Sequence, residues 1–310
     1  MDQMSAIARA VLYEGYMLWP YRRSAAKNRN RWTFGAVLPE AWSADHPDDR
    51  WLLQGQYLVE RPGIVSAAVR FLHVLQRQPY DTAGNPRDEL EAGGERHLAW
   101  EEATERDVPV PTAGRVPLAI PAGRDEEPVA GGTIVRRWER LDGWIEALTE
   151  PLAPDLVRLT VRVANTTAWA GDDRAAALRR SLVSTNIALH VEGGAFVSLT
   201  DPPEAFRAHA DACDNDGTWP VLVGEPGDRS AMLSAPITLE DHPRIAPESP
   251  GDLFDGGEID QLLILNVLAL SDAERREMRD SDPRAREILD RCAALGPDEL
   301  MELHGRWRRD

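Results

Sequence analysis

A strict alternation of apolar and polar side chains marks residues 156–165 and does most to limit how this chain can fold. The apolar set is Val157, Leu159, Val161 and Val163, and the residues between them are Arg158, Thr160 and Arg162. Because successive side chains of a β-strand point to opposite faces, the pattern predicts a strand with one buried and one solvated face. We expect this strand to pair with residues 133–148.

Two glycine-containing turns predict β-hairpins elsewhere in the chain. Arg61-Pro62-Gly63 separates residues 54–59 from 64–75, and Gly193-Gly194 separates 184–191 from 195–200. Further strands are expected at 115–120, as an edge strand, at 219–223, as a buried strand, and at 232–239. Residues 80–95 and most of 109–132 are rich in proline and glycine and are expected to be loops. Several hairpins with few helices between them favour a β-sandwich or barrel.

The end of the chain has a pattern that is typical of helices. Ser271 with Glu274 forms a capping box, and Asp282 precedes Pro283 as an N-cap before a first-turn proline. Short helices are also expected near 172–180 and 203–212. The predicted fold class is α+β, an antiparallel β-sandwich-like core with a C-terminal helical segment. We divide the chain into an N-terminal aromatic and basic segment (1–53) packing on the core, a β-rich core domain (54–257) and a helical segment (258–310).

The charge balance excludes one broad class of function. The chain has 35 basic and 52 acidic residues, a formal charge of −17, and Lys27 is its only lysine. Nucleic acids and anionic lipids attract proteins with a surplus of basic residues, so we expect no nucleic-acid partner. Charged residues interrupt every long apolar stretch, the N-terminal one included, so neither membrane insertion nor a secretory signal is predicted. We therefore expect cytoplasmic residence.

Motifs for nucleophilic or nucleotide chemistry are missing from the sequence. Neither a Gly-x-Ser-x-Gly elbow nor a glycine-rich phosphate loop occurs. Cys213 and Cys292 lack the spacing of a disulfide scaffold or a zinc site. Acidic neighbours are expected to raise the pKa of the Cys213 thiol, and Cys292 is expected to lie in the core.

Aromatic and basic residues gather near the N-terminus. Between Tyr21 and Trp32 the chain carries five positive charges and no negative one; they are Arg22, Arg23, Lys27, Arg29 and Arg31. One interpretation makes the segment a contact surface, since arginine and tryptophan are enriched where partners bind. The other has these arginines pairing with carboxylates of the same chain, for instance near Asp252.

An acidic stretch rich in proline and glycine spans residues 240–260, where seven carboxylates against one arginine give a charge of −6. Oxygen-rich loops suit hard divalent cations, so His242, Asp252, Asp255 and Glu258 are candidate metal ligands. The spacing does not match an EF-hand, and a solvated acidic loop with helix capping explains the same pattern. No cofactor is predicted, and a divalent cation stays open at this loop alone.

Several stretches carry a resemblance to a known family. They are Leu12-Tyr13-Glu14-Gly15-Tyr16 with Tyr21-Arg22, Asn30-Arg31-Trp32-Thr33-Phe34-Gly35, residues 179–185, residues 217–224, and residues 245–255 with 258–260. Through them, most of the chain resembles an uncharacterised conserved family encoded in [NiFe]-hydrogenase gene clusters. The resemblance implies an accessory role in making or organising a metalloenzyme, and it transfers no catalytic residue.

Two functions from different classes follow. The first is a non-catalytic accessory protein that binds a hydrogenase subunit or maturation factor during assembly or maturation of a [NiFe] hydrogenase. Its candidate contact residues are Tyr21, Arg22, Arg31, Trp32, Trp219, Glu248, Asp252 and Phe254. The alternative is a metal-dependent hydrolase that uses the acidic loop 252–260. A homo-oligomer without another partner also stays open.

Overall fold

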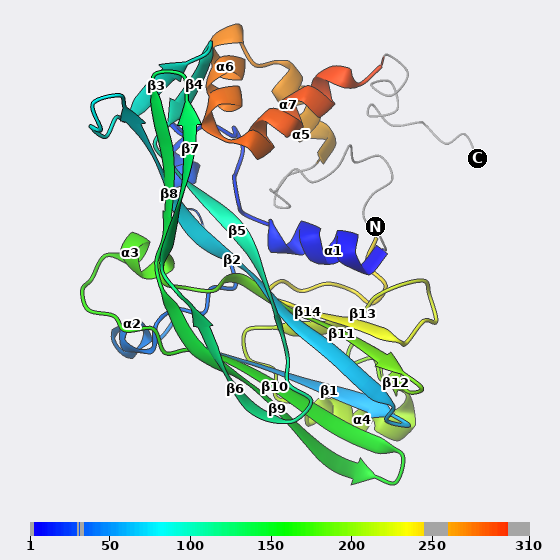
Figure 1. Cartoon of the computed structure of the whole chain (residues 1–310). Helices are drawn as coiled ribbons and strands as arrows, with labels where there is room; N and C mark the ends of the chain where they lie inside the picture. The colour runs from blue at the N-terminus through cyan, green and yellow to red at the C-terminus, as the bar shows by residue number, and fades with distance from the viewer. Residues whose placement is uncertain (1–2, 30, 32–33, 245–259, 297–310) are drawn as a thin grey trace.

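The computed structural model of the chain describes residues 3–29, 31, 34–244 and 260–296 (Figure 1). Two antiparallel sheets form its body. The first has the order β12 (Ala195–Phe196), β1 (Leu52–Glu60), β10 (Leu156–Asn165), β9 (Leu141–Ala153) and β6 (Gly114–Ile120). The second has the order β13 (Trp219–Leu222), β14 (Ala231–Ala235), β11 (Val183–Glu192), β2 (Ile64–Asp81), β8 (Gly132–Trp138) and β7 (Gly123–Val129).

The long strand β2 organises the second sheet. Its first part pairs with β11 and its last part with β8, while β5 (Trp100–Pro109) pairs along the opposite edge. The hairpin of β3 (Glu89–Ala92) and β4 (Glu95–Leu98) is a separate two-stranded sheet beside the end of β2. The outer part of β2 therefore extends past the sandwich and offers a face to other elements (Figure 1).

The space between the sheets holds the main core, as the alternation in residues 156–165 predicts. Leu159, Val161 and Val163 of β10 pack there with Tyr57 of β1 and Phe71 of β2. β10 pairs with β9 in antiparallel register, from Val157 opposite Pro151 to Asn165 opposite Gly143. The α+β, sandwich-like fold class is confirmed at this level: antiparallel sheets with helices at the C-terminal end of the chain.

Both predicted hairpins are wrong, for one shared reason. β1 and β2 belong to different sheets, as do β11 and β12, so each short turn carries the chain across the sandwich. The two crossings pack against each other, because a Cβ on Gly63 would lie 1.8 Å from the carbonyl oxygen of Glu192. A Cβ on Gly194 would lie 2.5 Å from the carbonyl oxygen of Arg61. The glycines permit this close approach of two backbones rather than a hairpin turn.

Other differences concern strands in regions of weak pattern. Residues 133–148 do not form one strand but contribute β8 and the start of β9, which lie in different sheets. The expected loop 80–95 contains β3. The expected loop 109–132 contains β7 in addition to the predicted edge strand β6. The strand β13 lies at the edge of its sheet, and its residues are buried as predicted except Trp219, which is 47% exposed.

Helices of nine to twelve residues lie at the two ends of the described chain, and those between them have five or six residues. They are α1 (Gln3–Leu12), α2 (Glu40–Asp45), α3 (Arg174–Leu178), α4 (Arg207–Asp211), α5 (Asp260–Leu268), α6 (Asp272–Ser281) and α7 (Pro283–Ala294), with 3-10 turns η1 (Ala26–Arg29) and η2 (Glu204–Phe206). The predicted capping box at Ser271 and the Asp282 cap before Pro283 are confirmed. No helix within the described ranges is long and apolar enough to cross a membrane.

A second core joins the two ends of the chain. Tyr13, Tyr16 and Met17 pack with Ile264 of α5 and Ile288 of α7 against the outer part of β2. In Figure 1 the C-terminal helices α5, α6 and α7 lie at one end of the molecule and α4 lies at the other. The N-terminal segment therefore packs on the C-terminal helices as well as on the sheet.

Candidate binding cleft

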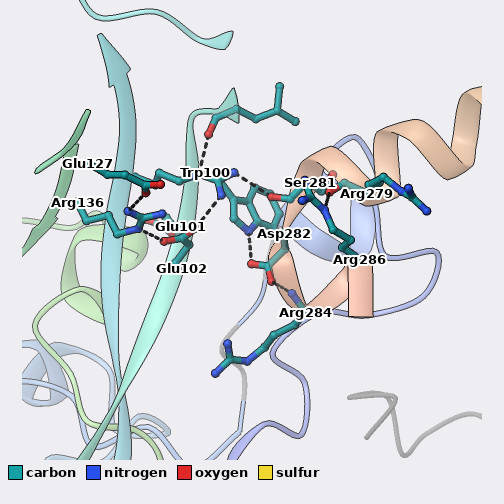
Figure 2. Close-up of polar contacts among 12 residues, drawn as sticks. Trp100, Glu101, Glu102, Glu127, Arg136, Arg279, Ser281, Asp282, Arg284 and Arg286 are labelled. Atoms are coloured by element: carbon teal, nitrogen blue, oxygen red, sulfur yellow. Dashed lines mark hydrogen bonds and ion pairs between the residues drawn. The ribbon is translucent and has the colours of Figure 1, made fainter. Parts of the chain in front are cut away.

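Asp282 ties the C-terminal helices to the N-terminal segment and the sheet. Figure 2 shows its contacts with Trp100 and Arg284. One carboxylate oxygen accepts the backbone N–H of Arg284 at 2.8 Å, which caps α7. The other accepts the hydroxyl of Tyr16 at 2.7 Å and the indole N–H of Trp100 at 3.3 Å. Asp282 is 1% exposed. Its charge is thus held by three donors from three separate segments.

Arginines stack on the aromatic side chains around this aspartate. The guanidinium of Arg31 lies 3.9 Å from the ring centroid of Trp100 and donates to the carbonyl oxygen of Tyr16 at 3.1 Å. The guanidinium of Arg284 lies 4.0 Å from the ring centroid of Tyr13. Burial, with the charge of Asp282 second, raises the pKa of the Tyr16 hydroxyl well above its usual range. Tyr16 therefore remains a neutral donor, and this cluster is a fixed wall rather than a titrating site.

A second buried network lies next to it, on β2, β5 and β8. Arg77 donates to a carboxylate oxygen of Glu102 at 2.7 Å and to the carbonyl oxygen of Ser281 at 3.0 Å. Arg136 donates to the other oxygen of Glu102 at 2.7 Å and to Glu127 at 2.8 Å (Figure 2). Because Arg77 and Glu102 are 7% and 8% exposed, removing Glu102 would leave the guanidinium of Arg77 buried without its carboxylate partner.

Arg31 and Trp100 of the first network line a cleft of about 1580 Å³. Its walls come from four parts of the chain: residues 23–31, the β3–β4 hairpin with the start of β5, α3, and α6. Trp100 and Leu98 supply apolar surface. Six arginines line the cleft, namely Arg23, Arg31, Arg96, Arg174, Arg276 and Arg279. Five acidic residues line it as well: Glu89, Glu91, Glu101, Glu277 and Asp280.

Most of the lining charges have partners in the chain. Arg96 pairs with Glu89, Arg174 with Asp49 at 3.1 Å and Arg279 with Asp290 at 2.9 Å. Arg179 pairs with Glu101 at 3.0 Å, and Glu277 accepts the backbone N–H of Ser24 at 3.2 Å.

Four lining charges remain after these pairs are assigned. Arg276 is exposed on α6 and has no hydrogen-bond or ion-pair partner within the described part of the chain. The guanidinium of Arg23 has the carbonyl oxygen of Asp88 at 3.4 Å and, among described residues, no carboxylate. Glu91 and Asp280 likewise have no ion-pair partner among the residues described. The cleft thus has charge available for a ligand.

The structure describes four of the predicted contact residues, Tyr21, Arg22, Arg31 and Trp219, and places them in different surroundings. Tyr21 is 0% exposed and Arg31 5%, so these two side chains are walls of the structure and are not open to a partner. Arg22 pairs with Glu274 at 3.0 Å, which supports internal pairing, although with α6 rather than with the acidic loop. Trp219 lies on the edge strand β13, beside a small pocket that Arg174 also lines.

The other predicted contacts, Trp32, Glu248, Asp252 and Phe254, lie outside the described residues, as do the candidate ligands Asp255 and Glu258. His242 is half-buried, and its ring Nδ1 lies 3.2 Å from the carbonyl oxygen of Gly224. Among the described residues no group of histidine, cysteine and carboxylate side chains is arranged to hold a metal ion.

The two thiols have the surroundings of structural cysteines. Burial raises the pKa of Cys213, while Arg158 lowers it; burial, not the acidic neighbours expected from the sequence, is the main cause. Burial raises the pKa of Cys292 to about 11, and this residue is 1% exposed in the second core, as predicted.

Sequence reasoning missed the residues that form the cleft on the sheet and on α6. Trp100, Arg276 and Asp280 belong to no motif. The only signal for them was indirect: several arginines occur on a helix with a capping box, where charged residues usually face solvent. Comparison of the chain with protein-family models, with curated protein sequences and with solved structures finds no match, so the site is defined by this geometry alone.

Proposed function

We propose that this chain is a non-catalytic accessory protein that binds a partner protein through the cleft between residues 23–31, the β3–β4 hairpin, α3 and α6. The observation that carries this proposal is the cleft itself, which is about 1580 Å³ in volume and lined by charged residues. Four of these charges have no ion-pair partner in the described part of the chain: Arg23, Glu91, Arg276 and Asp280. Ligand pockets for drug-sized molecules are about 300–1,000 Å³ and mostly apolar. A larger, charged cleft suits a segment of a protein better.

The rigidity of the walls supports the same function. Arg31, held between Trp100 and the backbone of Tyr16, and Asp282, held by three donors, fix the cleft floor without using the exposed charges. A preformed surface loses little side-chain entropy when a partner binds. The resemblance to the hydrogenase-cluster family suggests the partner's class: a subunit or maturation factor of a [NiFe] hydrogenase.

Co-purification tests this proposal. The tagged chain is purified at moderate salt from its native host during hydrogenase synthesis, and hydrogenase activity is measured in a deletion strain. We expect a hydrogenase subunit or maturation factor to be retained, and activity to fall on deletion and return on complementation. Full activity after deletion, with no hydrogenase-related protein retained, would exclude the proposed role.

A further inference from the structure

The cleft is an exception to the charge of the chain. Its lining has six arginines and five acidic side chains, a balance of +1, whereas the whole chain carries −17. The two arginines that lack carboxylate partners among the described residues, Arg23 and Arg276, come from opposite ends of the sequence and line the same cleft. A guanidinium group binds carboxylates with two parallel hydrogen bonds, so these two positions favour an acidic ligand.

We propose that the cleft binds an acidic segment of a partner protein, whose carboxylates pair with Arg23 and Arg276; this rests on the proposed function and specifies the chemistry of the partner. The volume of the cleft exceeds what one small carboxylate would fill. Trp100 and Leu98 give apolar contact area for the carbon atoms of such a segment.

Glu91 and Asp280, the two lining carboxylates without an ion pair among the described residues, restrict which acidic segment fits. Both interact electrostatically with Arg96, which also lines the cleft. Glu91 lies on the β3–β4 hairpin and Asp280 one helical turn beyond Arg276 on α6. Either would repel an acidic side chain placed beside it, so the segment has to carry neutral or basic residues at those points. Repulsion of this kind gives specificity against uniformly acidic chains.

The net charge of the protein does not prevent such binding. At about 0.15 M salt the Debye length is about 8 Å, so charges at the far end of the molecule are largely screened from the cleft. Local pairs with Arg23 and Arg276 then determine the affinity. At low salt the overall negative charge opposes association, so binding of the acidic segment is not expected to strengthen steeply as salt is removed.

Fluorescence polarisation with labelled dodecapeptides tests the proposal at about 0.15 M salt. One peptide has aspartate and glutamate separated by glycine and serine, the second replaces the acids by asparagine and glutamine, and the third replaces them by lysine. We expect the acidic peptide to bind about tenfold more tightly than either of the others, because one lost charge-assisted contact changes affinity by about that factor. Equal binding of the acidic and amide peptides would overturn the proposal.

Arg276→Glu is the decisive variant, since this exposed side chain supports no contact within the described part of the chain. It should weaken the acidic peptide about tenfold or more. Arg207→Glu, on α4 at the other end of the molecule, changes the net charge equally and should leave binding within about twofold. Equal effects of the two variants would refute a local site. Displacement of the peptide by free glutamate at the same carboxylate concentration would refute recognition of a segment.

The same variants separate the two proposals. Retention of the hydrogenase-related partner by Arg276→Glu, as strongly as by the unmodified chain, would leave the accessory function standing and overturn the acidic-segment site. If the acidic peptide binds but the unmodified chain retains no hydrogenase-related partner, the acidic-segment site would stand and the accessory function would be overturned.

Discussion

Stability of the fold should fall in mild acid because of one buried histidine. His73 lies on β2 and is 0% exposed, and neither ring nitrogen makes a hydrogen bond of ordinary geometry among the described residues. Burial first, and the charge of Arg106 second, lower its pKa from 6.5 to about 4, and a weak interaction with the backbone of Glu139 opposes this shift. The imidazole is therefore neutral in the folded protein at neutral pH.

The direction and size of the effect follow from proton linkage. Because the pKa is depressed in the folded state, the unfolded chain binds more protons between pH 6.5 and about 4. The stabilisation is complete above pH 6.5 and is lost as the pH falls through this window. Each pKa unit corresponds to about 1.4 kcal/mol, so the free energy of unfolding should fall by about 2 kcal/mol by about pH 5 and by about 3 kcal/mol by about pH 4.

Urea unfolding of the unmodified chain and of His73→Phe, measured between about pH 7.5 and pH 5, isolates this contribution from the titrating carboxylates. At neutral pH the free energy of unfolding of the variant can be higher or lower than that of the unmodified chain, because the substitution removes two buried nitrogens and changes the packing. The tested quantity is the difference between the two free energies of unfolding. It should shift by about 2 kcal/mol in favour of the variant toward the acidic end.

His209→Gln, a half-buried histidine on α4, measures what the loss of a histidine does by itself. Parallel curves for the unmodified chain and His73→Phe would refute the assignment of a neutral, desolvated imidazole. A shift of the same size in His209→Gln would refute the assignment to this position.

Three further predictions concern the contacts that hold the ends and crossings of the chain together. Asp282→Ala removes a helix cap and the acceptor of the Tyr16 hydroxyl and the Trp100 indole, so urea unfolding should register a loss of about 3 kcal/mol. Asp282→Asn, which can still cap, should lose clearly less. Gly63→Ala places a Cβ 1.8 Å from the Glu192 carbonyl oxygen and should lower the free energy of unfolding by more than about 3 kcal/mol. Gly84→Ala, with open space around a φ of +79°, should lower it by only about 1 kcal/mol. Equal losses in the two variants would refute the close contact. Cys292, buried with a pKa of about 11, should resist a thiol reagent at neutral pH until the protein is unfolded. In Cys213→Ser, where Cys292 is the remaining thiol, labelling at the rate of a free thiol would contradict the burial of Cys292.

Local patterns in the sequence predict local structure well where the contacts that produce the structure lie within the same few residues. The alternation in residues 156–165 predicts β10, and of its predicted partner 133–148 only the part within β9 pairs with it. The Ser271 and Asp282 caps predict the starts of α6 and α7. In each case the information lies within a few residues. The pattern fails for β7, because its acidic, outward-facing residues at the edge of a sheet resemble a loop.

The two hairpin predictions fail for a different reason. A glycine-containing turn between two strands has the same sequence signal whether the strands pair or cross between sheets. Which strand each of the two strands pairs with decides between a hairpin and a crossing. Gly63 and Gly194 are needed because the two crossings pack backbone to backbone, and this contact joins positions that are far apart in the chain. No pattern within either turn contains that information.

The cleft could not have been found from the sequence for the same physical reason. Asp282 is recognisable as a cap because the cap bond joins it to Arg284, two residues along. Its second oxygen accepts the hydroxyl of Tyr16, a residue 266 positions away, and this contact exists only because both ends of the chain pack on the outer part of β2. That packing brings Arg23 and Arg276 to one cleft. A function that depends on their meeting is therefore a property of the tertiary fold, and disrupting Asp282 should weaken acidic-peptide binding even though Asp282 does not line the cleft.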